Sequence, residues 1–118
     1  MTVIKIRDLT PYFHSTLSIE NKVFLYGASY GGHFALLIAC KYNVGRMFRA
    51  VVSHCGMSNL ACYPFECSGN VCDVMNIYAG TDDRKEYLRI IKPKSPYANI
   101  RHLCVPVLFV HTLADACI

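Results

Sequence analysis

The residues of this chain best suited to chemistry are Gly27-Ala28-Ser29-Tyr30-Gly31, a Gly-x-Ser-x-Gly pentapeptide. The motif lies between a short apolar run, Val23–Tyr26, and a longer run of mostly helix-forming residues that follows it directly. A sharp turn from a strand to a helix holds its central residue under backbone strain and lifts that side chain clear of the sheet. The sequence therefore predicts that Ser29 is a nucleophile. We expect Gly27 and Gly31 to remove Cβ atoms that would collide as the strand and the helix approach each other.

A carboxylate, Asp115, follows an apolar run near the end of the sequence, Val105–Val110. A serine hydroxyl is a weak nucleophile until a base removes its proton, and the usual base is a histidine oriented by a carboxylate. In one common order of these groups along a chain, the serine comes first, the carboxylate second and the histidine third. Ser29 and Asp115 occupy the first two places, and the three residues that follow Asp115 include no histidine.

Five histidines are present, and none of them has the sequence context of the missing base: His14, His33, His54, His102 and His111. His33 lies one helical turn after Ser29, and we expect it to pack beside the motif. His54 follows the second apolar run and is the strongest substitute, although it precedes Asp115 in the chain. We interpret all five as packed or surface histidines and expect the base to be absent from this chain.

A nucleophilic serine also needs hydrogen-bond donors for the oxyanion that forms in the transition state. The backbone N–H of Tyr30, directly after the serine, is one candidate donor. The second normally comes from a loop after an earlier strand, and no His-Gly-Gly-Gly-like loop occurs before Val23. We therefore expect residues 1–118 to form an incomplete peptidase or hydrolase catalytic domain, without its amino-terminal strands and its carboxy-terminal histidine segment.

The length and composition indicate one small globular domain. The chain has 118 residues, 53% of them hydrophobic, and a net charge of +4 from lysines and arginines that are scattered along the sequence. Such a distribution disfavours a nucleic-acid interface, which needs clustered positive charge. No apolar run is long enough to cross a bilayer, and the first ten residues lack the core of a signal peptide. We expect a cytoplasmic protein with no nucleic-acid or membrane partner.

Cysteine is frequent, with seven residues: Cys40, Cys55, Cys62, Cys67, Cys72, Cys104 and Cys117. Three of them are spaced five apart, but no Cys-x-x-Cys pair of the kind common in zinc sites occurs. We expect reduced thiols and no metal ion or other cofactor. A disulfide or a metal site at the spaced cysteines remains open as an alternative.

Three apolar runs rich in β-branched residues are predicted strands: Val23–Tyr26, Phe48–Ser53 and Val105–Val110. Helical runs separate them, at Gly31 to about Tyr42 and at Arg84–Ile91. This alternation predicts an α/β fold, a mostly parallel sheet with crossover helices. Functional groups gather beyond the carboxyl ends of the strands in such sheets, so we expect the serine and the carboxylate to share one rim.

The remaining segments have weaker signals. Val3–Ile6 is predicted to be extended and Asp8–Leu17 to be helical, with Thr10 as its N-cap. The stretch Met57–Gly80 lacks clear periodicity, and we expect a long loop with one or two short helices there.

Four blocks of this sequence resemble the prolyl oligopeptidase family of serine peptidases, which have an α/β-hydrolase fold. They are Gly27–Gly32, then Phe48–Ser53 with Gly56 and Asn59-Leu60, then Ser95-Pro96 with Ile100, and Val105–His111 with Thr112–Asp115. The tyrosine after the serine and the double glycine are typical of that family rather than of lipases. The resemblance implies a partial α/β-hydrolase fold in which Ser29 is the nucleophile and Asp115 is the triad carboxylate.

The main hypothesis is therefore a serine peptidase that cleaves peptide or small acyl substrates through an acyl-serine intermediate, with little or no turnover by this chain. A non-catalytic remnant or interaction module is one alternative, and an esterase-like acyl hydrolase is another. We also expect the chain to associate with itself through exposed sheet edges.

Overall fold

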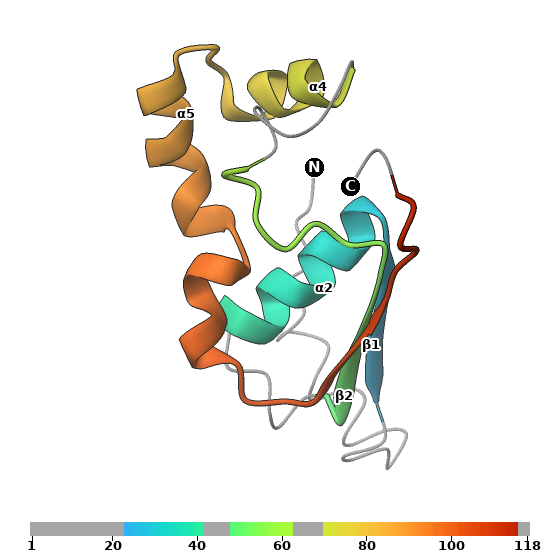
Figure 1. Cartoon of the computed structure of the whole chain (residues 1–118). Helices are drawn as coiled ribbons and strands as arrows, with labels where there is room; N and C mark the ends of the chain where they lie inside the picture. The colour runs from blue at the N-terminus through green and yellow to red at the C-terminus, as the bar shows by residue number, and fades with distance from the viewer. Residues whose placement is uncertain (1–22, 42–47, 63–69, 116–118) are drawn as a thin grey trace, which may run out of the picture.

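The computed structural model describes residues 23–41, 48–62 and 70–115, and its centre is a sheet of three parallel strands (Figure 1). The strands are β1 (Phe24–Ala28), β2 (Ala50–His54) and β3 (Val107–Val110), in the order β1-β2-β3. The three predicted strands are thus confirmed, each starting one or two residues later than the apolar run. The predictions for Val3–Ile6 and Asp8–Leu17 lie outside the described residues.

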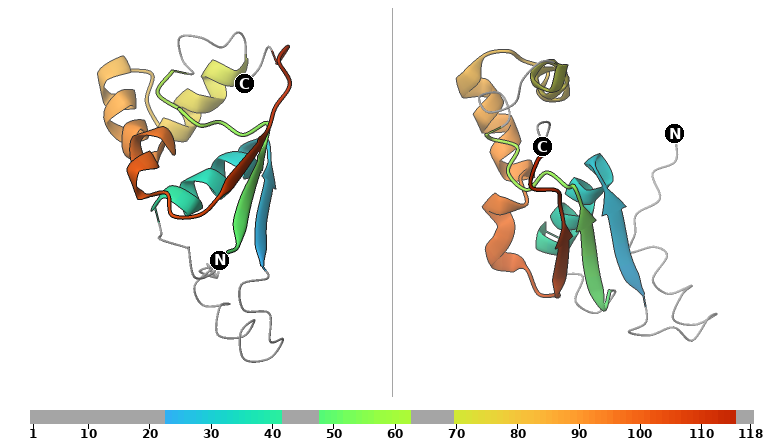
Figure 2. Two further views of the ribbon diagram at one scale, coloured as in Figure 1. Left: turned by 60° about the horizontal axis from the view of Figure 1, so that its bottom comes forward. Right: turned by 45° about the vertical axis from the view of Figure 1, so that its right-hand side comes forward.

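The crossover from β1 to β2 contains the helix α2 (Tyr30–Lys41), which lies against one face of the sheet (Figure 2). Small side chains on this helix let it approach the strands closely. The buried cluster between helix and sheet consists of Ala35, Ala39, Phe48, Val51 and Val105. The expected α/β architecture, with a parallel sheet and a crossover helix, is what the chain adopts.

The opposite face of the sheet is apolar and exposed in the described part of the chain. The register pairs Tyr26 with Val52 and Val52 with Leu108, so these three side chains form a row across that face. Tyr26 is 62% exposed and Leu108 is 59% exposed. Parallel sheets usually have both faces covered, which makes this row an unusual surface.

A second group of helices follows β2, and we call it the helical region. It consists of α4 (Asn70–Ala79), α5 (Arg84–Ile91) and two short 3-10 helices, η1 (Lys92–Lys94) and η2 (Tyr97–His102). The predicted helix at Arg84–Ile91 is confirmed. The long loop expected over Met57–Gly80 contains a helix of ten residues, α4.

The helical region has its own buried cluster, formed by Met57, Leu60, Met75, Tyr87 and Ile91. Polar contacts between distant residues close it. The Tyr87 hydroxyl donates to the Leu60 carbonyl oxygen at 2.8 Å, and the Leu60 N–H donates to the Ser95 hydroxyl at 3.0 Å. Because all three residues are buried, each bond satisfies a group that water does not reach.

Candidate active site

Ser29 occupies the junction between β1 and α2, and its backbone has a positive φ of 52°. Residues with a side chain rarely adopt this left-handed conformation, and sites that do are often functional. Two hydrogen bonds fix the backbone there. The Ser29 N–H donates to the His54 carbonyl oxygen at 2.8 Å, and the Ser29 carbonyl oxygen accepts from the His33 N–H at 3.2 Å. The side chain is exposed at the end of the strand.

Close backbone contacts around this junction require glycine at three positions. A Cβ at Gly27 would collide with the carbonyl oxygen of Gly31, and a Cβ at Gly32 would lie 2.8 Å from the Cα of Gly56. Gly56, in turn, has no room for a Cβ because the Ser53 hydroxyl and the backbone of Gly32 occupy that space. The expectation for Gly27 is confirmed, whereas that for Gly31 is wrong, because a Cβ there would meet no described atom within 4 Å. The helix approaches β2 through the next glycine, Gly32.

The carboxyl ends of the three strands meet at one rim, as the sequence predicted for a parallel sheet. His54 pairs with Ala28 on one side and with Val110 on the other. The Cys55 N–H continues this alignment by donating to the Val110 carbonyl oxygen at 2.7 Å. Since neighbouring strands lie about 4.8 Å apart, the backbones at Ser29 and at the end of β3 are roughly 10 Å apart. Ser29 and the segment that bears Asp115 thus leave the sheet from the same edge.

Cys55 lies between these two segments, and sequence reasoning did not single it out. It follows the central strand, is partly exposed, and has a positive φ of 46°. The signal that could have found it is its position, directly after the second predicted strand and therefore on the expected rim.

Asp115 is paired with a histidine from its own segment. Nε2 of His111 lies 3.5 Å from Oδ2 of Asp115, and the aspartate side chain is 16% exposed. The sequence analysis noted both residues but predicted no contact between them. The spacing of four residues brings them together in the turn after β3.

The remaining described histidines have partners away from the Ser29 hydroxyl. His33 is fully buried, Nδ1 donates to the Met57 carbonyl oxygen at 3.0 Å, and burial lowers its pKa, so the ring is neutral near pH 7. His54 is exposed, and Nδ1 is hydrogen-bonded to the Tyr26 hydroxyl at 3.0 Å. His102 is exposed and accepts from Arg101 at 3.2 Å. Among the described residues, no histidine is hydrogen-bonded to the Ser29 hydroxyl, and His33 packs beside the motif as expected.

Tyr30 is the first residue of α2, where backbone N–H groups have no partner within the helix. Its side chain points toward the helical region and contacts Phe34 and Tyr78 edge to face, with ring centroids 4.9 Å and 5.9 Å away. Burial and a hydrogen bond with Tyr78 raise the pKa of the Tyr30 phenol. The residue next to Ser29 is therefore joined to α4, a contact that the sequence did not predict.

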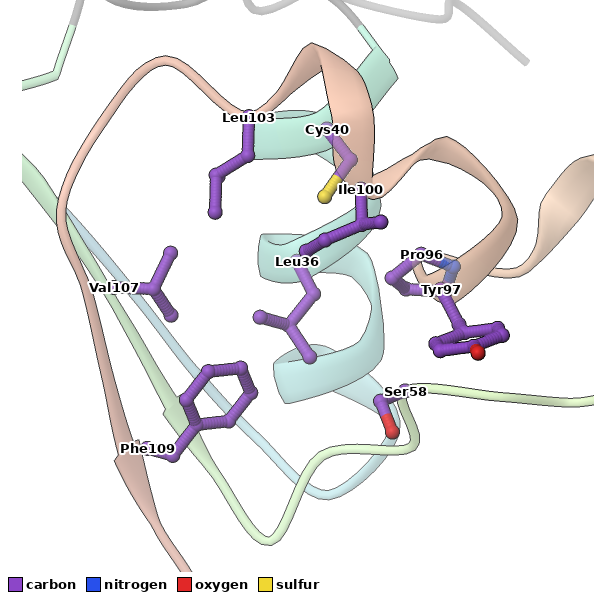
Figure 3. A pocket seen from close by; sticks show the side chains of 9 residues that line it. All are labelled: Leu36, Cys40, Ser58, Pro96, Tyr97, Ile100, Leu103, Val107 and Phe109. Carbon is purple, nitrogen blue, oxygen red and sulfur yellow. The ribbon is translucent and has the colours of Figure 1, made fainter.

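An apolar pocket of about 180 Å³ lies between α2, η2 and β3 (Figure 3). Leu36, Ile100 and Phe109 project toward its centre, and its lining contains no charged side chain. The pocket offers apolar surface but no group that could serve as an acid, a base or an anion ligand.

In the ranges that the structure describes, Cys40, Cys55, Cys62 and Cys104 are free thiols. No three histidine, cysteine, aspartate or glutamate side chains gather there in a group that could hold a metal ion. Of the described helices, none is both long and apolar enough to span a membrane.

Comparisons with known proteins agree with this architecture. The model of the prolyl oligopeptidase family matches residues 10–118. Among solved structures, the chain is similar to an acylaminoacyl peptidase in complex with Z-Gly-Gly-Phe-chloromethyl ketone, with 17% identity and a TM-score of 0.67, over 92% of this chain and 17% of that one. It is also similar to esterase B from Lactobacillus Rhamnosis (HN001), with 22% identity and a TM-score of 0.53, over 75% of this chain and 32% of that one.

These likenesses show a partial α/β-hydrolase fold. The chain spans only 17% and 32% of the lengths of these two proteins. No curated protein sequence matches it.

Proposed function

The chain belongs to the prolyl oligopeptidase family, and we propose that it carries the nucleophile and the carboxylate of a serine peptidase of that type. The observation that supports this best is the exposed Ser29 side chain, on a backbone with φ of 52° at the end of β1. A strained residue at a turn from strand to helix is how such enzymes present a nucleophilic serine. The shared rim of Ser29 and Asp115 supports the pairing of the two.

In the proposed reaction, the Ser29 hydroxyl attacks the carbonyl carbon of a peptide or small acyl substrate. The N–H of Tyr30 donates to the oxyanion of the tetrahedral intermediate, which collapses to an acyl-serine and releases the amine. Water then attacks the acyl-serine and restores the hydroxyl. Asp115 orients the histidine that moves the proton in both steps.

We propose little or no turnover by the 118-residue chain itself. The reason is that no described histidine contacts the Ser29 hydroxyl, and a general base typically contributes about 10²- to 10⁴-fold to the rate. His111 does not replace it, because its Nε2 is directed at the Asp115 carboxylate.

Labelling with a fluorophosphonate probe tests this proposal. We expect slow labelling that maps to Ser29 by mass spectrometry and disappears in Ser29→Ala. The matched control is Ser58→Ala, which removes a different exposed serine and leaves the labelling unchanged. Labelling at another residue would overturn the assignment of the nucleophile. Fast labelling at Ser29 would overturn the proposed lack of activity.

Two other functions have a specific observation in their favour. The lack of a described histidine on Ser29 favours a non-catalytic remnant or interaction module, which predicts that Ser29→Ala leaves any cellular role intact. The structural similarity to an esterase favours an acyl hydrolase. Hydrolysis of a simple ester in the absence of any cleavage of the matching peptide amide would favour the esterase over the peptidase.

A further inference from the structure

The side chain of Tyr30 connects α2 to the end of α4. Its ring contacts Phe34, one turn further along α2, with ring centroids 4.9 Å apart and planes at 87°. It contacts Tyr78 with centroids 5.9 Å apart and planes at 85°. Both are edge-to-face arrangements, the geometry that aromatic pairs prefer. Tyr30 is thus packed on one side by its own helix and on the other by the helical region.

A hydrogen bond between the Tyr30 and Tyr78 side chains adds direction to this contact. Both rings pack against the buried cluster of the helical region. Tyr78 is itself held from a third element, because Nζ of Lys94 in η1 lies 4.9 Å from the centroid of its ring, within cation–π range. The position of Tyr78 is therefore set by two elements of the helical region, α4 and η1.

The backbone of Tyr30 belongs to the junction that presents Ser29. The His33 N–H donates to the Ser29 carbonyl oxygen at 3.2 Å, a long hydrogen bond that starts the first turn of α2. On its other side, Ser29 is bonded to β2 through the His54 carbonyl oxygen. The sheet therefore holds the Ser29 side of the junction, and the side chain of Tyr30 is what can hold the helix side.

We propose that Tyr78 is a positioning residue for the candidate active site. Its hydroxyl, through the hydrogen bond with Tyr30, fixes the first turn of α2 and with it the Tyr30 N–H and the Ser29 hydroxyl. This inference rests on the proposed function for its effect on reactivity, but its effect on the backbone is independent of that function.

The test compares Tyr78→Phe, which keeps the ring and removes the hydroxyl, with Tyr97→Phe, which removes a hydroxyl from a tyrosine that is 66% exposed. The first measurement is hydrogen exchange of individual backbone amides. Since one hydrogen bond contributes about threefold to tenfold to an equilibrium, we expect the His33 amide to exchange that much faster in Tyr78→Phe. The Cys40 amide, at the far end of α2, should be unchanged, and Tyr97→Phe should change neither amide.

Tyr30→Phe and the double variant make the test specific to the pair. Tyr30→Phe should raise the His33 exchange rate by a similar factor, and the double variant should add little beyond either single change. Alkaline titration of the tyrosines supplies a spectroscopic signature. The Tyr30 phenol should ionise nearer its ordinary pKa of 10.0 in Tyr78→Phe, because one of the causes that raises its pKa has been removed.

The rate of fluorophosphonate labelling at Ser29 is the second measurement, and it should fall about threefold to tenfold in Tyr78→Phe. Unchanged exchange at His33, or additive effects in the double variant, would overturn the inference. Faster exchange at His33 with an unchanged labelling rate would overturn the link to Ser29. If Ser29 does not label in any variant, the proposed function fails, while the exchange rates still decide whether Tyr78 fixes the helix start.

Discussion

The sheet region (β1–β3 with α2) and the helical region (α4, α5, η1 and η2) are each built around a buried cluster, but different contacts close the two. In the sheet region, the backbones of α2 and β2 approach each other at Gly32 and Gly56, with no room for a side chain. In the helical region, hydrogen bonds of side chains join residues that lie far apart in the sequence, such as Leu60 and Ser95.

This difference bears on how each region contributes to the candidate active site. Backbone contact leaves Ser29 with one conformation, so the sheet region acts as a rigid support. The helical region reaches the site through the side chains of Tyr78 and of Met57, whose carbonyl oxygen accepts from His33. Substitutions in the two regions should therefore differ in size and in kind.

The largest effect is expected for Gly27→Ala. Its Cβ would collide with the carbonyl oxygen of Gly31, and the start of α2 would have to move. We expect the free energy of unfolding to fall by more than about 3 kcal/mol, measured by urea denaturation. Gly31→Ala is the matched control, since its Cβ meets no described atom, and alanine favours a helix by up to about 1 kcal/mol over glycine. Equal destabilisation by the two would contradict the role given to backbone contact.

Intermediate effects are expected in the helical region for Tyr87→Phe and Ser95→Ala. Each removes one partner of a buried backbone group of Leu60, which is then left without a hydrogen bond. Such a loss costs about 1–3 kcal/mol of the free energy of unfolding. Tyr97→Phe, at an exposed position, serves as the control in the same denaturation experiment. A cost below that of the control would show that these polar contacts do not hold the region together.

A pH dependence is expected from His33, whose side chain links the two regions. Burial lowers its pKa below the ordinary value of 6.5, so the unfolded chain takes up a proton that the folded chain does not. This contribution to stability is present above pH 6.5 and is lost as the pH falls through the folded pKa, by at most about 1.4 kcal/mol per pH unit.

Thermal unfolding between pH 7 and pH 5 measures this contribution. His33→Asn keeps a donor for the Met57 carbonyl oxygen but does not titrate, and it should reduce the pH dependence. An identical dependence in wild type and His33→Asn would assign it to other groups.

The smallest effect concerns the exposed face of the sheet, where we expect self-association. Leu108→Lys places a charge in the apolar row that Tyr26, Val52 and Leu108 form, and should weaken association by about 1–2 kcal/mol in sedimentation equilibrium. The matched control is Ile77→Lys in α4 of the helical region, where the isoleucine is 80% exposed. If Ile77→Lys disrupts association as strongly, the contact lies on the helical region instead.

The elements of the sheet region could be predicted from the sequence because their signals are local. An apolar run rich in β-branched residues marks each strand, and the glycine motif marks the start of α2. For the same reason the helix at Arg84–Ile91 was predictable, from its composition and the proline that follows it. The position of Ser29 at the end of a strand follows directly from these patterns.

Long-range contacts explain what the sequence did not show. The helix α4 has one fully buried described side chain, Met75, and its other contacts come from Tyr30 and from α5, so its own periodicity is weak. Gly31 was expected to be essential because it belongs to the motif, yet the helix turns its neighbour toward β2. The pairing of His111 with Asp115 depends on the turn after β3, which no residue pattern specifies.

The most direct test of the account is the rate at which a fluorophosphonate labels Ser29 with and without added imidazole, because the account describes a nucleophile in position without its base. We predict slow labelling that imidazole accelerates about tenfold, since it supplies a general base from solution. The label should map to Ser29 and be lost in Ser29→Ala. Labelling that is fast without imidazole, or that does not respond to it, would contradict the account.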